Sequence, residues 1–179
     1  MLEDKVCAVL SRVPANVQGD GKHTIEELVT QKNRDPLRGR DHRTPLEIIQ
    51  MGEMETLMLK GQGYQFDSIP KNDEIVYLRE NSNVSTGGDS IDVTDQISDD
   101  YKKIAVDAVS LLGAKISGID LIIENKDVPA ASENAYGILE ANFNPSMYMH
   151  AYPYKGKPHN LTIEIIHYLF PELLQSQPK

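Results

Sequence analysis

The sequence lacks the features that mark secreted and membrane-spanning proteins. It contains one cysteine, Cys7, among 179 residues, so no disulfide can form within the chain, as is usual in the reducing cytosol. No apolar run reaches the roughly 18 residues that a membrane span requires, and the N-terminus has no signal-peptide pattern of basic and apolar regions. We therefore expect a cytoplasmic protein with no membrane partner.

Positive charge is also scarce. Eighteen Lys and Arg residues against 27 Asp and Glu residues give a net charge of −9. No stretch is basic enough to follow a phosphate backbone, so we expect no nucleic-acid partner, although a nucleotide bound through magnesium is compatible with this charge. The length of 179 residues fits one domain.

Two helices are predicted in the segment 22–63. The first begins with a capping box, Thr24 with Glu27. The second is expected to begin at Thr44, with Pro45 at the first helical position and Glu47 completing a second capping box, and to end at Lys60, before Gly61 and Gly63. We interpret this segment as a helical insertion between strands.

Apolar runs predict the strands. Strands are expected at residues 5–13, 75–79, 115–123 and 137–143, and further helices after Ser98 and at about 160–169. The segment 80–95 is too polar and glycine-rich for a core element. Because two strands follow each other across one loop, we expect an antiparallel pair with helices on one face. The predicted fold class is therefore α+β, with a largely antiparallel sheet.

Acidic and amide residues interrupt the two apolar strands. Asp120 lies in the first, and Glu140 and Asn142 lie two apart in the second, so the latter two point to the same face. A carboxylate buried without a partner is costly. If the strands pair, these side chains make an oxygen-rich site suited to Mg²⁺. The alternative is that the carboxylates face solvent on a half-exposed sheet.

A second candidate site follows the strand at 75–79. Arg79 precedes the stretch SNVSTGG, which contains Asn83, Gly87 and Gly88. Small residues let backbone N–H groups converge on an anion, and an arginine at a strand end can hold a phosphate oxygen. The alternative is an ordinary turn, since a Gly-Gly pair is more often just that.

Other residues give weaker signals. His150, His159 and Cys7 match no zinc-ligand spacing. The run at 147–154, MYMHAYPY, is either a loop lining the active site or ordinary packing, and we favour the loop.

Taken together, the motifs resemble the C-terminal part of an ATP-grasp ligase. The strings that carry the resemblance are RVPANVQGDGKHTIEELV (12–29), NRDPLRG (33–39), LRENSNVSTGGDSIDVTD (78–95), GIDLII (118–123) and EANFNPSMYMHAYPYKGK (140–157). The last string is most similar to the glutathione synthetase module of the bacterial bifunctional glutamate–cysteine ligase/glutathione synthetases. Cyanophycin synthetases are also similar, but they usually carry Pro-Gly and then Arg near Ser146, which this sequence does not.

The resemblance assigns roles to nine residues. It implies that Mg²⁺ or Mn²⁺ is bound by Asp120, Glu140 and Asn142. It implies that Arg79 and Asn83 are catalytic, at the γ-phosphate and the acyl phosphate. Four further residues would help to bind ATP: Gly87, Gly88, Arg12 and Asn144. It also implies the ATP-dependent joining of γ-glutamylcysteine and glycine through an acyl phosphate, with catalysis by positioning and charge neutralisation.

The resemblance further implies that the chain, 1–179, is a single C-terminal subdomain of a longer enzyme. The other ATP-grasp lobe and a glutamate–cysteine ligase module would be its partners, and Met1 would be an added start. We expect the chain alone to bind ATP weakly and to be inactive. Two alternatives remain: a cyanophycin synthetase-like amino-acid ligase, and a non-catalytic binding module that keeps the fold.

Overall fold

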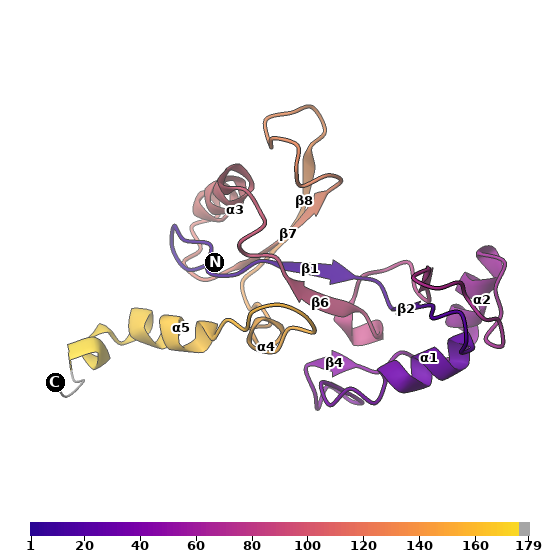
Figure 1. Cartoon of the computed structure of the whole chain (residues 1–179). Coiled ribbons are helices and arrows are strands. Elements are labelled where there is room, and N and C mark those ends of the chain that lie inside the picture. The colour runs from indigo at the N-terminus through magenta and orange to yellow at the C-terminus, as the bar shows by residue number, and fades with distance from the viewer. Residues whose placement is uncertain (176–179) are drawn as a thin grey trace. The chain divides into compact units, whose positions relative to one another are not determined.

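The computed structural model describes residues 1–175 and divides into two compact units. The first unit comprises residues 1–10, 92–151 and the chain from 157 onward; the second comprises 11–91 and 152–156. Within the described residues, the strands form four separate two-stranded ladders, which are β1–β6, β2–β5, β3–β4 and β7–β8 (Figure 1). The mixture of helices and strands confirms the α+β class, although the strands do not join into one sheet.

The second unit contains most of the short elements. They are β2 (Asn16–Gln18), α1 (Ile25–Lys32), β3 (Arg38–Gly39), β4 (Leu46–Glu47), α2 (Glu53–Gly61), β5 (Ile75–Tyr77), the 3₁₀ turn η1 (Val84–Thr86), and all but one residue each of β1 (Leu10–Val13) and β6 (Asp89–Asp92). β2 pairs antiparallel with β5. Val17, Val29, Ile49, Leu59 and Leu78 are almost fully buried and form the centre of one apolar cluster. This cluster fixes α1 and α2 against the β2–β5 ladder.

The two helix predictions for this unit had different outcomes. The capping box of α1 is confirmed: the Glu27 N–H donates to Thr24 Oγ1 at 3.2 Å, and the Thr24 N–H donates to Glu27 Oε2 at 2.9 Å. The helix predicted from Thr44 is wrong at its start, since α2 begins only at Glu53. Backbone N–H groups on either side of Glu47 donate instead to carbonyls near β3, so tertiary pairing outweighed the capping signal.

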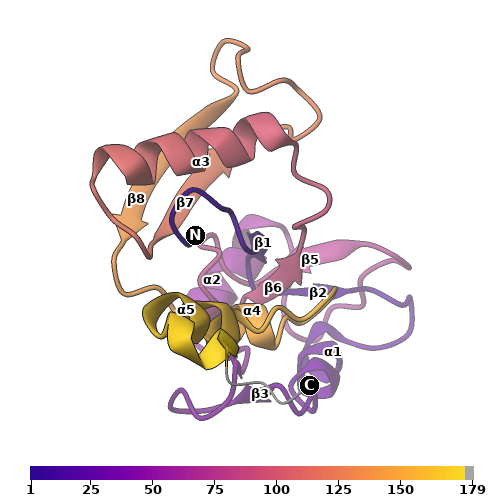
Figure 2. The ribbon, with the colours of Figure 1, turned by 90° about the vertical axis from the view of Figure 1, so that its left-hand side faces the viewer.

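The first unit is built on one long ladder. It contains α3 (Asp99–Leu111), β7 (Gly118–Ile123), β8 (Tyr136–Asn142), α4 (Tyr148–Ala151), α5 (Leu161–Leu169) and the 3₁₀ turn η2 (Pro171–Gln175). β7 and β8 pair antiparallel, as predicted, and α3 lies across them (Figure 2). The Tyr101 ring of α3 meets the Tyr136 ring edge to face, with centroids 6.3 Å apart.

Two strand predictions need correction. The first strand covers Leu10–Val13 rather than 5–13. The segment 80–95 was predicted to hold no core element, yet it contains β6, in which Asp89 and Ser90 are buried. The prediction failed because the partners that satisfy Asp89 come from residues far away in sequence, on α1 and β3.

No helix in residues 1–175 is both long enough and apolar enough to cross a bilayer. The interpretation of 1–179 as one subdomain with an insertion stays a prediction. The segment 22–63 lies wholly within the second unit.

Candidate functional site

The predicted metal ligands share one face of the β7–β8 ladder. Asp120 lies directly opposite Glu140, and Gly118 lies opposite Asn142. Directly opposed residues of an antiparallel pair point to the same face, and so do residues two apart on one strand. The Asp120, Glu140 and Asn142 side chains therefore project from the same side of the ladder. The register is regular from Gly118 to Asp120, where the three predicted ligands lie, and a bulge follows between Asp120 and Leu121.

This oxygen-rich face fits a divalent cation. Asn142 is oriented by its neighbour, since its Oδ1 accepts the Asn144 N–H at 2.9 Å. Within the described residues no three His, Cys, Asp or Glu side chains come together as a metal site. A cation here would therefore draw on Asp120, Glu140, the Asn142 amide oxygen and non-protein oxygens. This is how Mg²⁺ is usually held: one or two carboxylates plus waters and substrate phosphates.

Arg79, one of the predicted catalytic residues, is held by an acid from the predicted insertion. It follows β5, and its Nε–H donates to Glu55 Oε1 at 2.6 Å. The Glu55 side chain is 1% exposed and that of Arg79 18% exposed. Glu55 lies in the first turn of α2, so this ion pair joins α2 to the predicted phosphate-binding segment.

The turn around Gly87 and Gly88 is closed on itself. The N–H groups of Thr86 and Gly88 both donate to the Asn83 carbonyl at 3.1 Å, and that of Gly87 donates to the Val84 carbonyl at 3.2 Å. The expected convergence of glycine N–H groups on an anion is therefore wrong for these two residues. Their assignment to ATP binding stays a prediction. In the structure, the two glycines let the backbone turn sharply and pack closely against neighbouring segments.

Both glycines are required by their surroundings. Gly87 has φ +91°, which is unfavourable for other residues, and a Cβ there would lie 2.8 Å from Ile49 Cα. A Cβ on Gly88 would lie 2.8 Å from the carbonyl oxygens of Val13 and Asn83. The turn therefore packs tightly against β1 and against the chain that precedes α2.

A buried ionic cluster lies beside this turn, and sequence reasoning missed it. The Asp89 carboxylate accepts hydrogen bonds from Lys32 Nζ at 2.7 Å and Asn16 Nδ2 at 3.1 Å, and it pairs with Arg38. The Arg38 Nη1–H groups donate to the Gly87 carbonyl at 3.0 Å and to the Glu47 carbonyl. Arg38 thus connects the glycine turn to the predicted insertion.

Tyr154 covers the two cations of this cluster. The Lys32 ammonium lies 5.2 Å and the Arg38 guanidinium 5.3 Å from the centre of its ring, within cation–π range. Burial lowers the pKa of Lys32 and of Arg38, and the Asp89 carboxylate opposes both shifts. Burial, with Asp89 next in importance, raises the pKa of Tyr154.

No sequence signal would have found this cluster directly. Arg38 lies between the two helices predicted in 22–63, and Asp89 lies in a segment expected to fall outside the core. The predicted loop at 147–154 supplies Tyr154, whose role is to cover buried cations.

The remaining candidates are Arg12, Asn144, His159 and Cys7. Arg12 lies on β1 and is half-buried, and Asn144 is exposed just after β8. His159 Nε2 lies 3.0 Å from Asp92 Oδ1, whereas Cys7 Sγ lies 3.7 Å from the Lys5 carbonyl. These contacts give the two residues separate surroundings rather than one zinc site.

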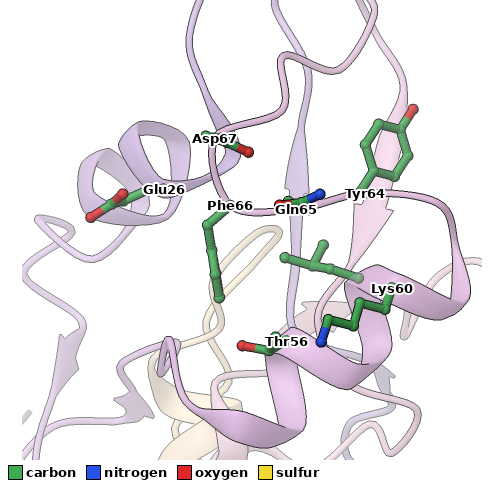
Figure 3. A pocket seen from close by; sticks show the side chains of 8 residues that line it. Glu26, Thr56, Lys60, Tyr64, Gln65, Phe66 and Asp67 are labelled. Atoms are coloured by element: carbon green, nitrogen blue, oxygen red, sulfur yellow. The ribbon is translucent and has the colours of Figure 1, made fainter.

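A pocket of about 280 Å³ opens in the second unit (Figure 3). Leu59 and Phe66 provide apolar walls, and Glu26, Lys60 and Asp67 provide charged ones. No predicted catalytic, ATP-binding or metal-binding residue lines it.

The comparisons with known proteins agree with the predicted resemblance. The chain is 60% identical to the glutathione biosynthesis bifunctional protein GshAB of Enterococcus faecalis over 176 residues, covering 98% of this chain and 23% of that protein. The Listeria monocytogenes protein of the same name is 54% identical over 170 residues, covering 95% and 22%. No protein-family model matches the chain.

A solved structure is similar to the whole fold. The crystal structure of a bifunctional glutathione synthetase from Pasteurella multocida matches with a TM-score of 0.88 and 53% identity, over 96% of this chain and 24% of that one. The chain thus spans about a quarter of the length of the proteins it matches. The resemblance to bifunctional glutathione-making enzymes that the motifs predicted is confirmed.

Proposed function

We propose that this chain is the C-terminal, metal- and phosphate-binding part of an ATP-grasp carboxylate–amine ligase that makes glutathione. The observation that carries the proposal is the register of β7 and β8, which aligns Asp120 with Glu140 and Gly118 with Asn142 on one face. The names of the relatives, which cover nearly the whole chain at 50–60% identity, support the substrate assignment.

Each unit has its own part in this proposal. In the first, Asp120, Glu140 and Asn142 hold Mg²⁺ or Mn²⁺, which when bound neutralises phosphate charge. In the second, Arg79 binds the γ-phosphate, with Asn83 and the Gly87–Gly88 turn shaping its surroundings. The fixed guanidinium stabilises negative charge where the phosphoryl group is transferred. Arg12 and Asn144 are further candidate contacts to the nucleotide.

The proposed reaction has two steps. The glycine-accepting carboxylate of γ-glutamylcysteine attacks the γ-phosphorus of ATP, so a C–O–P bond forms and ADP leaves. The glycine amine then attacks the acyl carbon, phosphate leaves with the electron pair of the broken C–O bond, and the nitrogen loses a proton to solvent as the amide forms. Because no covalent bond to the protein is needed, positioning and charge stabilisation are the contributions expected of these residues.

The partners follow from the same proposal. ATP, γ-glutamylcysteine and glycine are the substrates, and the other ATP-grasp lobe and a glutamate–cysteine ligase module belong to the same longer chain, in the cytoplasm. A single lobe offers only part of the contacts to ATP. We therefore expect the 179 residues alone to bind ATP weakly and not to catalyse.

The test is ADP release by the full reading frame with Mg-ATP and γ-glutamylcysteine, with and without glycine. We expect glycine-dependent release that falls more than about 100-fold in Asp120→Ala, since even indirect partners of a metal ligand contribute about 10–100-fold. Glu124→Ala removes an exposed carboxylate just beyond β7 and serves as the matched control.

Three outcomes would contradict parts of the proposal. Release that requires aspartate or arginine instead of glycine would support a cyanophycin synthetase-like ligase. No release with any of these amines would support a non-catalytic binding module. Equal activity of Asp120→Ala and Glu124→Ala would remove Asp120 from the metal site.

A further inference from the structure

We propose that Glu55 is a positioning residue for Arg79, and that the segment 22–63 thereby fixes how this arginine meets a phosphate. The inference rests on the proposed function, because it assumes that Arg79 binds the γ-phosphate of ATP. It gives the predicted insertion a role that neither the sequence motifs nor the comparisons assign.

Glu55 is itself fixed at both carboxylate oxygens. Oε1 accepts the Arg79 Nε–H at 2.6 Å, and Oε2 accepts the Gly52 N–H at 2.9 Å, at the start of α2. The Glu55 side chain is 1% exposed, so water competes little for either carboxylate oxygen. The N-terminus of a helix also favours a carboxylate through its dipole. The position of Glu55, and through it that of Arg79, is therefore set by the first turn of α2.

This contact decides which edge of the guanidinium is available. Arginine carries five N–H donors in a planar fork, and it can bind a phosphate through the Nε–Nη edge or through the two Nη groups. The bond to Glu55 occupies Nε. In residues 1–175 the hydrogen bond found for Arg79 is this one, and its side chain is 18% exposed. Arg79 is thus left to bind an anion end-on, through its Nη groups.

Fixing the arginine in advance has a catalytic consequence. A free arginine side chain loses rotamer entropy when a ligand orders it. With Glu55 in place much of that ordering is complete before ATP arrives. An error of about 1 Å in the placement of such a group can lower the rate about 100-fold.

A purely structural role for Glu55 makes a different prediction. If it only caps α2, its loss lowers stability but leaves the function of Arg79 unchanged in the folded fraction. The capping bond needs only Oε2, whereas the bond from Arg79 occupies Oε1. Nucleotide preference and kcat measured on folded Glu55 variants separate the two roles, because a capping defect alone would change neither.

The experiment compares nucleotide binding and turnover in variants of the full reading frame. Binding of Mg-ATP and Mg-ADP is measured by calorimetry without γ-glutamylcysteine, and glycine-dependent ADP release is measured separately. Glu55→Gln removes the charge and leaves one carbonyl oxygen for two donors. Glu55→Asp keeps the charge, which protects the fold, but draws the carboxylate back by one methylene. Glu53→Gln, an exposed acid in the same helical turn, is the matched control.

We expect both Glu55 variants to lose about tenfold of the preference for ATP over ADP, as for one charge-assisted hydrogen bond, and to lower kcat about 100-fold. The KM for γ-glutamylcysteine and the properties of Glu53→Gln should not change. In an Arg79→Lys background, Glu55→Gln should add little further loss, because both changes remove the same contact.

Two results would overturn the inference. The first is a Glu55→Asp variant with the ATP preference and kcat of the wild type. The second is a double variant, Glu55→Gln with Arg79→Lys, whose loss of kcat equals the product of the losses in the two single variants. Failure of the proposed function is recognised separately, since wild-type protein would then bind no Mg-ATP or release no ADP with glycine.

Discussion

Replacing Asp89 by asparagine tests whether the buried ionic cluster beside the glycine turn stabilises the second unit. The side chains of Arg38 and Lys32 are 0% and 13% exposed, and Asp89, itself 6% exposed, is the carboxylate paired with both. The asparagine amide has nearly the same shape as the carboxylate but carries no charge. Two buried cations would then lack their counter-ion, which typically costs about 3–5 kcal/mol.

This cost converts into a measurable change in melting temperature. For a protein of this size each kcal/mol lowers Tm by about 2–4 °C, so Asp89→Asn should lower it by about 6–20 °C. The assay is thermal unfolding followed by circular dichroism. Asp67→Asn, which removes an exposed carboxylate from the same unit, is the control and should change Tm little.

A second substitution checks the electrostatic explanation. Lys32→Met in the Asp89→Asn background removes one of the two unpaired cations, so it should recover part of the lost stability. If Asp89→Asn melts within about 2 °C of the wild type, or if Lys32→Met lowers Tm further, the charges of this cluster are not what stabilises it.

Two further predictions concern the glycine turn and a partly buried histidine. Gly87→Ala should lower stability by about 1–3 kcal/mol in chemical denaturation, because of its positive φ and the approach of Ile49, while Gly61→Ala, with open space around it, should not destabilise. Burial lowers the pKa of His150 to about 4 from 6.5, so the unfolded state binds the proton first and stability falls as the pH drops between these values. His150→Gln should flatten this part of the pH–Tm profile relative to the wild type, and identical profiles would contradict the assignment.

The sequence predicted the parts of the fold that depend on neighbours along the chain. The Thr24–Glu27 capping box, the helix after Ser98 and the antiparallel pairing of the two apolar strands are all local patterns, and all three formed. The capping signal at Thr44 failed because residues around Glu47 pair with β3, which lies earlier in the chain. A local pattern cannot report a competitor that is brought in by tertiary folding.

Some residues around the candidate site were recognisable from the sequence, and others were found only in the structure. Asp120, Glu140 and Asn142 were recognisable because polar residues in apolar strands stand out, and the strand register then aligns them. By contrast, Asp89 lies more than fifty residues away from Lys32 and Arg38 in the sequence, and all three have ordinary neighbours along the chain. Their burial and pairing arise only when α1, β3 and β6 pack together.

The sequence by itself determined the α+β class, the resemblance to glutathione-making ligases and the residues of a candidate metal site, because periodicity and motif spacing are local properties of the chain. Only the tertiary structure decided that Glu55 holds Arg79, that the glycine turn closes on its own N–H groups, and that Tyr154 covers two buried cations. These are contacts between distant segments, and their energies depend on burial that no local pattern encodes.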